Sequence, residues 1–247
     1  MKISIIGTGK MAYALIDALK DSFEIEVVGR DKQKIKKLQE NGIEAKSYDE
    51  FNSQEKILIL AIKPYALKEV SKYFKKTPNI LISVLAGTKI KSLKESIKAN
   101  FYIRAMPNLA AKYKKSMTTL TGDKEAKEEA IKIFEKIGNS LWVESEKELD
   151  IATAIAGSGP AFLALVAEAL EDGGVMQGLK RDDAKKLTEG LFEGFASLLK
   201  DNHPALIKEE VMSPAGTTAS GCASLEEDRV RSAFIKAVEA AFQKTQK

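Results

Sequence analysis

Glycine and alanine near the N-terminus are spaced as a phosphate-binding turn requires. Gly7, Gly9 and Ala12 stand in the G-x-G-x-x-G/A pattern, between a short apolar run and an amphipathic segment. Gly7 permits a tight turn, Gly9 lets a pyrophosphate approach the backbone, and Ala12 lets the next helix pack closely. Unpaired N–H groups at the beginning of that helix would bind the phosphates. The turn predicts a dinucleotide site, although a purely structural turn shares this pattern.

Hydroxyl side chains gather at a second turn near the C-terminus. Ser213 precedes Pro214, and Gly216, Thr217 and Thr218 follow at the predicted beginning of a helix. Hydroxyls and free N–H groups at such a position suit a carboxylate or another anion. The alternative is an ordinary Ser-Pro helix cap.

The end of the second predicted strand indicates which dinucleotide binds. In a dinucleotide fold, an acidic residue there binds the 2′-hydroxyl of NAD. This chain has Gly29 and Arg30 instead, which leave room for a 2′-phosphate and a cation to pair with it. We therefore expect NADP to be preferred over NAD, although Arg30 could simply end the strand and Asp31 could still meet the ribose.

Small and polar residues follow three further strands. Ala61, Lys63 and Pro64 follow one strand, and Ala86 follows the next. Asn108 stands after Pro107, where it could bind the nicotinamide ribose or only form an Asx turn. Because ligands of open α/β sheets lie beyond the carboxyl ends of the strands, these positions are candidates for coenzyme contacts.

The elements that must position these residues alternate in the first half of the chain. Strand patterns stand at 2–6, 24–28, 57–61, 80–84 and 101–104. They alternate with an amphipathic helix that carries Met11, Leu15, Ala18 and Leu19, and with helical patterns at 32–41, 64–75 and 89–99. Two further short strands, at 117–121 and 140–143, flank a helix at 124–137. This order predicts an α/β fold: a Rossmann-like, doubly wound, mostly parallel sheet.

The pattern becomes entirely helical after residue 146. Helices are predicted at 148–156, 160–177, 181–201, 216–225 and from 226 to the end. The expected domains are therefore a dinucleotide-binding domain at 1–148 and an all-helical domain at 149–247. The helix at 160–177 is apolar on nearly every side, which favours burial against a second subunit and hence a homodimer.

Composition excludes several classes of protein. The chain has 247 residues, 44% of them hydrophobic and 30% charged, with a net charge of +4. Its single cysteine excludes an internal disulfide and a cysteine-based metal cluster, so no metal site is expected. Lysines are scattered, which argues against nucleic-acid binding. No apolar run is expected to span a membrane, and a cytoplasmic location fits.

The scarcity of histidine and lysine side chains that could act as a catalytic acid indicates which kind of electrophile the protein reduces. Reduction of a carbonyl needs an acid to protonate the alkoxide. The only histidine is His203, which precedes a proline, and no lysine lies between Lys147 and Lys180. A protonated cyclic imine is already electrophilic, so one hydroxyl at the ring nitrogen together with orientation can suffice. This favours an imine substrate, with Thr218 as the candidate hydroxyl.

These motifs together resemble the pyrroline-5-carboxylate reductase family over almost the whole chain. The resemblance rests on Gly7-Thr8-Gly9-Lys10-Met11-Ala12, Ala61-Ile62-Lys63-Pro64, Arg104-Ala105-Met106-Pro107-Asn108, Gly157-Ser158-Gly159-Pro160-Ala161-Phe162 and Ser213-Pro214-Ala215-Gly216-Thr217-Thr218.

The resemblance implies a Rossmann domain that binds NADPH or NADH and a helical domain that interlocks with a partner's, with larger assemblies built from dimers. It implies reduction of 1-pyrroline-5-carboxylate to L-proline, with the substrate carboxylate on Ser213, Gly216, Thr217 and Thr218. Coenzyme contacts are expected at Gly7, Thr8, Gly9, Lys10, Met11, Arg30, Ala61, Lys63, Pro64, Ala86 and Asn108.

Two positions depart from the family's pattern. Ala215 replaces a glycine next to the substrate, and Leu109-Ala110-Ala111 replace the usual Thr-Pro-Ala. Two other functions fit the same two-domain shape: an NADP-dependent reductase of a different imine or ketone, and a non-catalytic dinucleotide sensor. The intact turn at 213–218 argues against the sensor.

Overall fold

The computed structural model describes residues 1–246, and these divide into two compact units. The first unit comprises Met1–Ser158 together with the chain from Ala241 on, and the second comprises Gly159–Ala240. The predicted boundary between residues 148 and 149 falls inside helix α6 (Glu146–Ala152), which belongs to the first unit.

The first unit is built on one eight-stranded sheet. Its strand order is β3-β2-β1-β4-β5-β6-β7-β8, and every neighbouring pair is parallel except β6 and β7. The strands are β1 (Lys2–Ile6), β2 (Glu24–Gly29), β3 (Glu44–Ser47), β4 (Ile57–Leu60), β5 (Ile80–Ser83), β6 (Phe101–Met106), β7 (Ser116–Gly122) and β8 (Gly138–Trp142). The predicted α/β class and mostly parallel sheet are confirmed.

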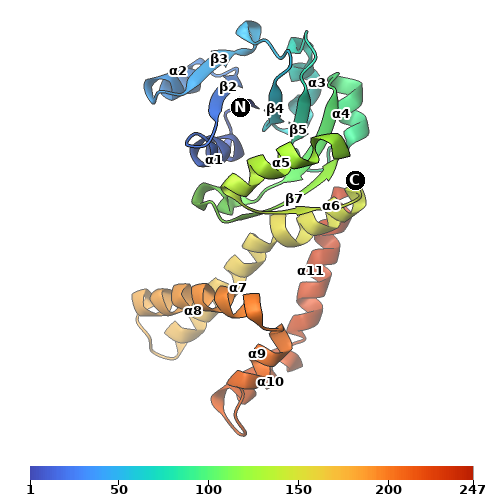
Figure 1. Ribbon diagram of the computed structural model, residues 1–247. Coiled ribbons are helices and arrows are strands. Elements are labelled where there is room, and N and C mark those ends of the chain that lie inside the picture. Colours follow the sequence, from blue (N-terminus) through green and yellow to red (C-terminus); the bar gives the residue numbers. More distant parts are fainter. Residues whose placement is uncertain (247) are drawn as a thin grey trace. The chain divides into compact units, whose positions relative to one another are not determined.

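Helices cover both faces of this sheet. Alternate residues of a strand point to opposite faces, so Ile59 joins one apolar core and Leu60 joins the other. The first core includes side chains from α1 (Lys10–Leu19), α2 (Lys32–Glu40) and α5 (Lys127–Phe134), whereas the second includes α3 (Leu67–Val70) and α4 (Ile90–Ser96). Figure 1 shows α3 and α4 together beside β4 and β5.

Several local predictions needed correction. Strand β3 and helix α9 (Pro204–Val211) are present where no element was predicted. The single helices predicted at 64–75 and 124–137 are broken. The first consists of η2 (Pro64–Ala66), α3 and η3 (Ser71–Tyr73), and the second of η5 (Lys124–Ala126), α5 and η6 (Glu135–Ile137). The remaining short turns are η1 (Tyr48–Glu50), η4 (Leu109–Tyr113) and the π-helical η7 (Thr153–Gly157).

A buried carboxylate holds the first strands together. Glu26 lies in β2, fully buried, and accepts hydrogen bonds from Ser4 Oγ and Lys56 Nζ, each at 2.6 Å. Lys46 Nζ lies 2.6 Å from its other oxygen. Burial acts to raise the pKa of Glu26, but these three donors outweigh it and lower the pKa to about 2.

A second buried ionic cluster attaches helix α6, which follows β8, to the sheet of the first unit. Arg104, in β6, is 1% exposed and donates to Asp150 and Glu146 of α6, each at 2.9 Å. Gln246 also donates to Asp150, at 3.3 Å. These bonds join α6 and the chain's last described residue to the sheet.

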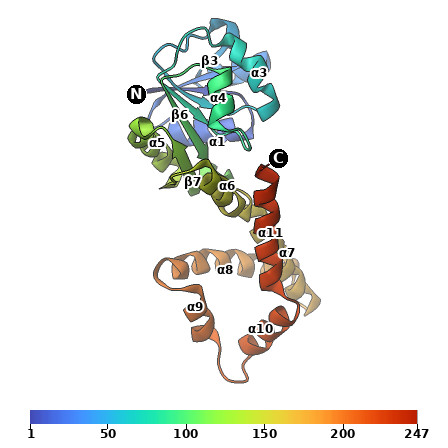
Figure 2. The ribbon, with the colours of Figure 1, turned by 90° about the vertical axis from the view of Figure 1, so that its right-hand side faces the viewer.

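The second unit consists of helices alone. They are α7 (Gly159–Met176), α8 (Arg181–Asp201), α9, α10 (Thr217–Glu227) and most of α11 (Val230–Thr245). Figure 2 shows α8, α9 and α10 as successive helices joined by loops. Helix α7 packs on α8 where Gly174 approaches Leu179 and Ala184, and Arg181 pairs with Asp172 at 2.6 Å.

Few side chains of the second unit are buried within a single chain. Of residues 159–240, only Ala184, Thr188 and Ile207 are buried, and α7 contributes none. The expectation that no apolar run reaches the length of a membrane span is wrong for one stretch. The helical run Glu146–Met176 contains an 18-residue window of mean hydropathy 1.6, of which 17% is buried.

Candidate active site

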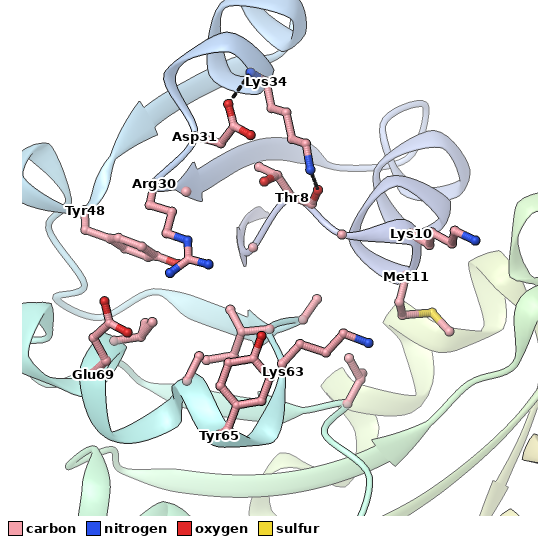
Figure 3. A pocket seen from close by; sticks show the side chains of 18 of the residues that line it. Thr8, Lys10, Met11, Arg30, Asp31, Lys34, Tyr48, Lys63, Tyr65 and Glu69 are labelled. Atoms are coloured by element: carbon pink, nitrogen blue, oxygen red, sulfur yellow. Dashed lines mark hydrogen bonds between the residues drawn. The ribbon is translucent and has the colours of Figure 1, made fainter.

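A cavity of about 660 Å³ lies at the carboxyl ends of β1, β2 and β4 in the first unit (Figure 3). Its walls come from the turns that follow these strands, together with residues of α2, α3 and the 3-10 turns. The lining residues are Gly7, Thr8, Gly9, Lys10, Met11, Gly29, Arg30, Asp31, Lys34, Tyr48, Ala61, Ile62, Lys63, Tyr65, Ala66, Glu69, Val70, Tyr73, Val84 and Leu109. Eight residues predicted to contact the coenzyme are among them.

The glycine turn after β1 has the geometry of a phosphate site. Gly7 has a φ of +123°, and a Cβ there would lie 2.5 Å from the carbonyl oxygen of Ala61, so only glycine fits. A Cβ on Gly9 would meet no atom within 4 Å, which leaves open space in front of the backbone. Helix α1 begins after Gly9 without a side-chain cap, so its first N–H groups are available to an anion.

Basic side chains surround the end of β2. Figure 3 shows the Arg30 side chain extending into the cavity, and Lys34 of α2 donates to the carbonyl oxygen of Thr8 at 3.3 Å. Asp31 instead caps α2, because its Oδ1 accepts from the N–H groups of Gln33 and Lys34 at 3.0 and 3.2 Å. One oxygen of the Asp31 carboxylate that could have met a ribose is therefore used by the helix.

Tyrosines form the wall beside Arg30. Tyr48 and Tyr73 stack with ring centroids 5.1 Å apart. Burial raises the pKa of Tyr48, the positive charge of Arg30 partly offsets this rise, and the charge of Glu69 adds to it. Tyr65 also lines the cavity, although it is 82% exposed.

Three predicted coenzyme contacts are not part of this lining. Pro64 begins the turn η2, and Ala86 follows Val84, which lines the cavity in its place. Asn108 forms the Asx turn that the sequence left as one alternative, since its Oδ1 accepts from the N–H of Ala110 at 3.0 Å. Its Nδ2 donates to the carbonyl oxygen of Ala156 at 2.9 Å, so both ends of the amide are used within the protein.

The charges of the cavity suit a polyanion. Lys10, Arg30, Lys34 and Lys63 line it, against two carboxylates, Asp31 and Glu69. The open backbone at Gly9, the uncapped N-terminus of α1 and these cations together fit the pyrophosphate and phosphates of a dinucleotide. Within residues 1–246, no group of three or more His, Cys, Asp or Glu side chains is arranged to hold a metal ion.

The predicted substrate residues lie together in one turn of the second unit. The N–H of Gly216 donates to the carbonyl oxygen of Ser213 at 3.0 Å, and α10 begins at the next residue. A Cβ on Gly216 would collide with Ser213 Oγ, so a larger residue at position 216 would displace the Ser213 side chain. Helix α10 has no side-chain cap, which leaves the N–H groups of its first turn available to an anion.

Some lining residues escaped the sequence analysis. Lys34 lies in the first turn of α2, soon after the end of β2, and this nearness in the sequence could have identified it. Tyr48, Glu69 and Tyr73 come from separate short segments that meet only in the folded sheet, so no local pattern indicates them. His203 has a structural role as the cap of α9, where its Nδ1 accepts from the N–H of Ala205 at 3.2 Å.

Two family models match the chain, one in each part. A model described as "Pyrroline-5-carboxylate reductase dimerisation" matches residues 146–247. A model described as "NADP oxidoreductase coenzyme F420-dependent" matches residues 2–87. The matched ranges correspond to the helical part and to the part that carries most of the cavity.

Full-length relatives agree with both matches. The chain is 36% identical over 246 residues to a pyrroline-5-carboxylate reductase of Helicobacter pylori, and the match covers 95% of each chain. The crystal structure of 1-pyrroline-5-carboxylate reductase from Streptococcus pyogenes superimposes with a TM-score of 0.89 at 31% identity, over 99% of this chain and 98% of that one. The Plasmodium falciparum pyrroline carboxylate reductase, solved with NADP bound, gives 0.83 at 28% identity, over 99% and 98%.

Proposed function

The chain belongs to the pyrroline-5-carboxylate reductase family, and we propose that it catalyses the last step of proline biosynthesis in the cytoplasm with NADPH as its preferred coenzyme. Its reaction is the reduction of the cyclic imine 1-pyrroline-5-carboxylate to L-proline, with hydride supplied by NAD(P)H. The observation that carries this assignment is the similarity over the full length, which includes both the dinucleotide turn and the helical part.

The preference for NADPH rests on the end of β2. Arg30 extends into the cavity, Lys34 lies beside it, and Asp31 is committed to capping α2. A 2′-phosphate placed there would meet two cations, whereas the acid available to the hydroxyl of NAD at this strand end, Asp31, already uses one oxygen to cap α2. The relative from Plasmodium falciparum, which was solved with NADP, supports the same choice.

We assign the substrate carboxylate to the turn at 213–218. Ser213 Oγ and the N–H groups of Thr217 and Thr218 can donate to its two oxygens, while Gly216 closes the turn by donating its N–H to the carbonyl oxygen of Ser213. The imine would bind with its nitrogen already protonated from solvent, and the Thr218 hydroxyl oxygen would accept a hydrogen bond from that N–H and hold the ring for hydride addition at its C=N carbon. Because the product is an amine, no strong acid is needed at this position.

The working unit is proposed to be a homodimer or a larger assembly built from it. The helical part matches a dimerisation domain, and α7 buries none of its side chains within one chain. A surface of this kind is stable in water only when another subunit covers it.

The assay that tests this function follows NADPH oxidation with three substrates under the same conditions. We expect rapid oxidation with 1-pyrroline-5-carboxylate, formation of proline, and little oxidation with ketopantoate or a 2-keto acid. A reductase of a different ketone would show the reverse order. A sensor protein would bind NADPH without oxidising it in any of the three mixtures.

A further inference from the structure

One carbonyl at the beginning of α7 lacks its ordinary helical partner. In an α-helix, the carbonyl of Ala156 would accept from the N–H of residue 160, and residue 160 is proline. The chain is π-helical at this point, since the N–H of Ser158 donates to the carbonyl of Thr153 at 3.0 Å. Such π turns occur frequently at functional sites.

Asn108 supplies the donor that proline cannot. Its Nδ2 lies 2.9 Å from the carbonyl oxygen of Ala156, although the two residues are 48 positions apart in the chain. Its Oδ1 accepts from the N–H of Ala110 at 3.0 Å, and its own backbone N–H donates to Ser116 Oγ at 3.0 Å. These bonds determine the orientation of the amide, because only the NH₂ group can face a carbonyl oxygen.

The same residue determines the position of a wall of the coenzyme cavity. Asn108 is the N-cap of η4, and the first residue of η4 is Leu109, which lines the cavity. One side chain therefore ties this wall to the π turn that leads into α7. Loss of its NH₂ donor would break the link between the two segments while leaving the cap at Ala110 intact.

We propose that Asn108 is a positioning residue that replaces the missing N–H of Pro160 and so holds Leu109 and the π turn at 153–157 in fixed register for hydride transfer. The proposal rests on the proposed reductase function for its kinetic part and on the hydrogen bonds alone for its structural part. It differs from the coenzyme-ligand role expected from the sequence, because the amide oxygen and one amide N–H already bond within the protein.

The test compares Asn108→Asp and Asn108→Ser with the wild type. Both substitutions keep an oxygen that can cap Ala110, and both remove the NH₂ group that donates to Ala156; the serine hydroxyl lies on a shorter side chain. The matched control is Asn139→Asp, the same chemical change at an exposed position of β8. We expect each Asn108 variant to lose about tenfold in kcat while the KM for NADPH stays within about twofold, since cations at the far end of the cavity hold the coenzyme.

A double-mutant cycle with Pro160→Ala tests the structural part independently of activity. Alanine at 160 supplies an N–H to Ala156, so Asn108→Asp should lower the Tm by about 2–4 °C in the wild type and by clearly less in the Pro160→Ala background. Additive Tm changes, or an unchanged kcat, would overturn the proposal. A KM for NADPH that rises as much as kcat falls would show that Asn108 binds the coenzyme directly instead of positioning other residues. If the wild type did not reduce pyrroline-5-carboxylate, the proposed function would be contradicted. The Tm measurements would still show whether Asn108 replaces the missing N–H of Pro160.

Discussion

Among single residues, Arg30 is the one on which the proposed preference for NADPH depends most directly. Replacing it with alanine removes one charge-assisted contact to a 2′-phosphate, worth about 1.5–3 kcal/mol. Arg30→Ala should therefore weaken NADPH binding by about tenfold to a hundredfold and change NADH binding little. Titration of protein fluorescence with each coenzyme measures both constants. Lys32→Ala, on an exposed position of α2 outside the cavity lining, is the matched control, and equal losses for both coenzymes would contradict the role of Arg30.

Thr218 is the residue on which the proposed chemistry depends. Thr218→Val keeps the shape and removes the hydroxyl, so it should lower kcat/KM by tens-fold, on the order of 1–3 kcal/mol. Ser213→Ala should chiefly raise the KM for the imine and leave NADPH binding unchanged. Steady-state kinetics with each substrate varied separates the two effects. Ser224→Ala removes an exposed hydroxyl from the same helix as a control. A fully active Thr218→Val enzyme would leave the turn as a carboxylate clamp only.

Ala215 adopts a backbone conformation that favours glycine. Its φ is +54°, in the left-handed region, which costs an alanine about 1–2 kcal/mol. Glycine removes this cost but adds chain entropy to the unfolded state, about 0.4–1 kcal/mol. We therefore expect Ala215→Gly to raise the Tm by about 2 °C in thermal unfolding. Ala223→Gly, at an exposed helical position of α10, should lower the Tm instead, and the same sign for both would refute the strain at Ala215.

At the scale of elements, Glu26 links β1, β2, β3 and the residue before β4. Its folded pKa of about 2 lies below the ordinary value of 4.5, so it stabilises the fold fully above pH 4.5 and progressively less as pH falls toward 2. The difference corresponds to about 3 kcal/mol.

Urea unfolding of Glu26→Gln across pH measures this contribution. We expect the variant to have a lower free energy of unfolding than the wild type at pH 7. This difference should narrow steadily below pH 4.5, because Glu26 then takes up a proton in the unfolded wild type but not in the folded one, which favours unfolding of the wild type alone. Glu24→Gln changes an exposed residue of the same strand and should show neither effect. A gap that stays constant down to pH 2.5 would mean that Glu26 acts through packing alone.

At the scale of the whole molecule, the helical part supports the proposed assembly. Large apolar side chains of this part remain exposed in one chain, among them Leu163, Leu165, Leu170, Met176, Leu187, Leu191, Phe195 and Ile235. The match to a dimerisation domain accounts for them, and for a helical run apolar enough to cross a membrane by length and composition.

Sedimentation at micromolar concentration tests the assembly. The wild type should sediment as a dimer or larger, and Leu165→Glu, at a position 66% exposed in α7, should shift it toward monomer and lower its activity. Leu141→Glu, at an exposed position of β8, is the control with the same change. A folded and active wild-type monomer would contradict the dimer, and dissociation by Leu141→Glu alone would move the interface to the sheet edge.

The sequence by itself determined the features that depend on neighbours along the chain. The β-branched runs, the glycine turn at 7–12 and the change to helical periodicity after residue 146 led to the α/β class and to the family. These signals are local because a strand of alternating or continuous apolar residues, or a Gly-rich turn, has the same preference in any surroundings. The placement of Arg30 at the cavity follows from the same argument, since it directly follows the end of β2.

Tertiary contacts decided the rest. β3 has the polar sequence Glu44-Ala45-Lys46-Ser47 and becomes a strand through pairing with β2, and the antiparallel direction of β7 depends on its pairing with β6. The convergence of Tyr48, Glu69 and Tyr73 on the cavity, and of Asn108 on Ala156, joins segments that share no local pattern. The physical reason is that a strand at a sheet edge, or an amide at a turn, takes its role from the donors and acceptors that the completed fold brings to it.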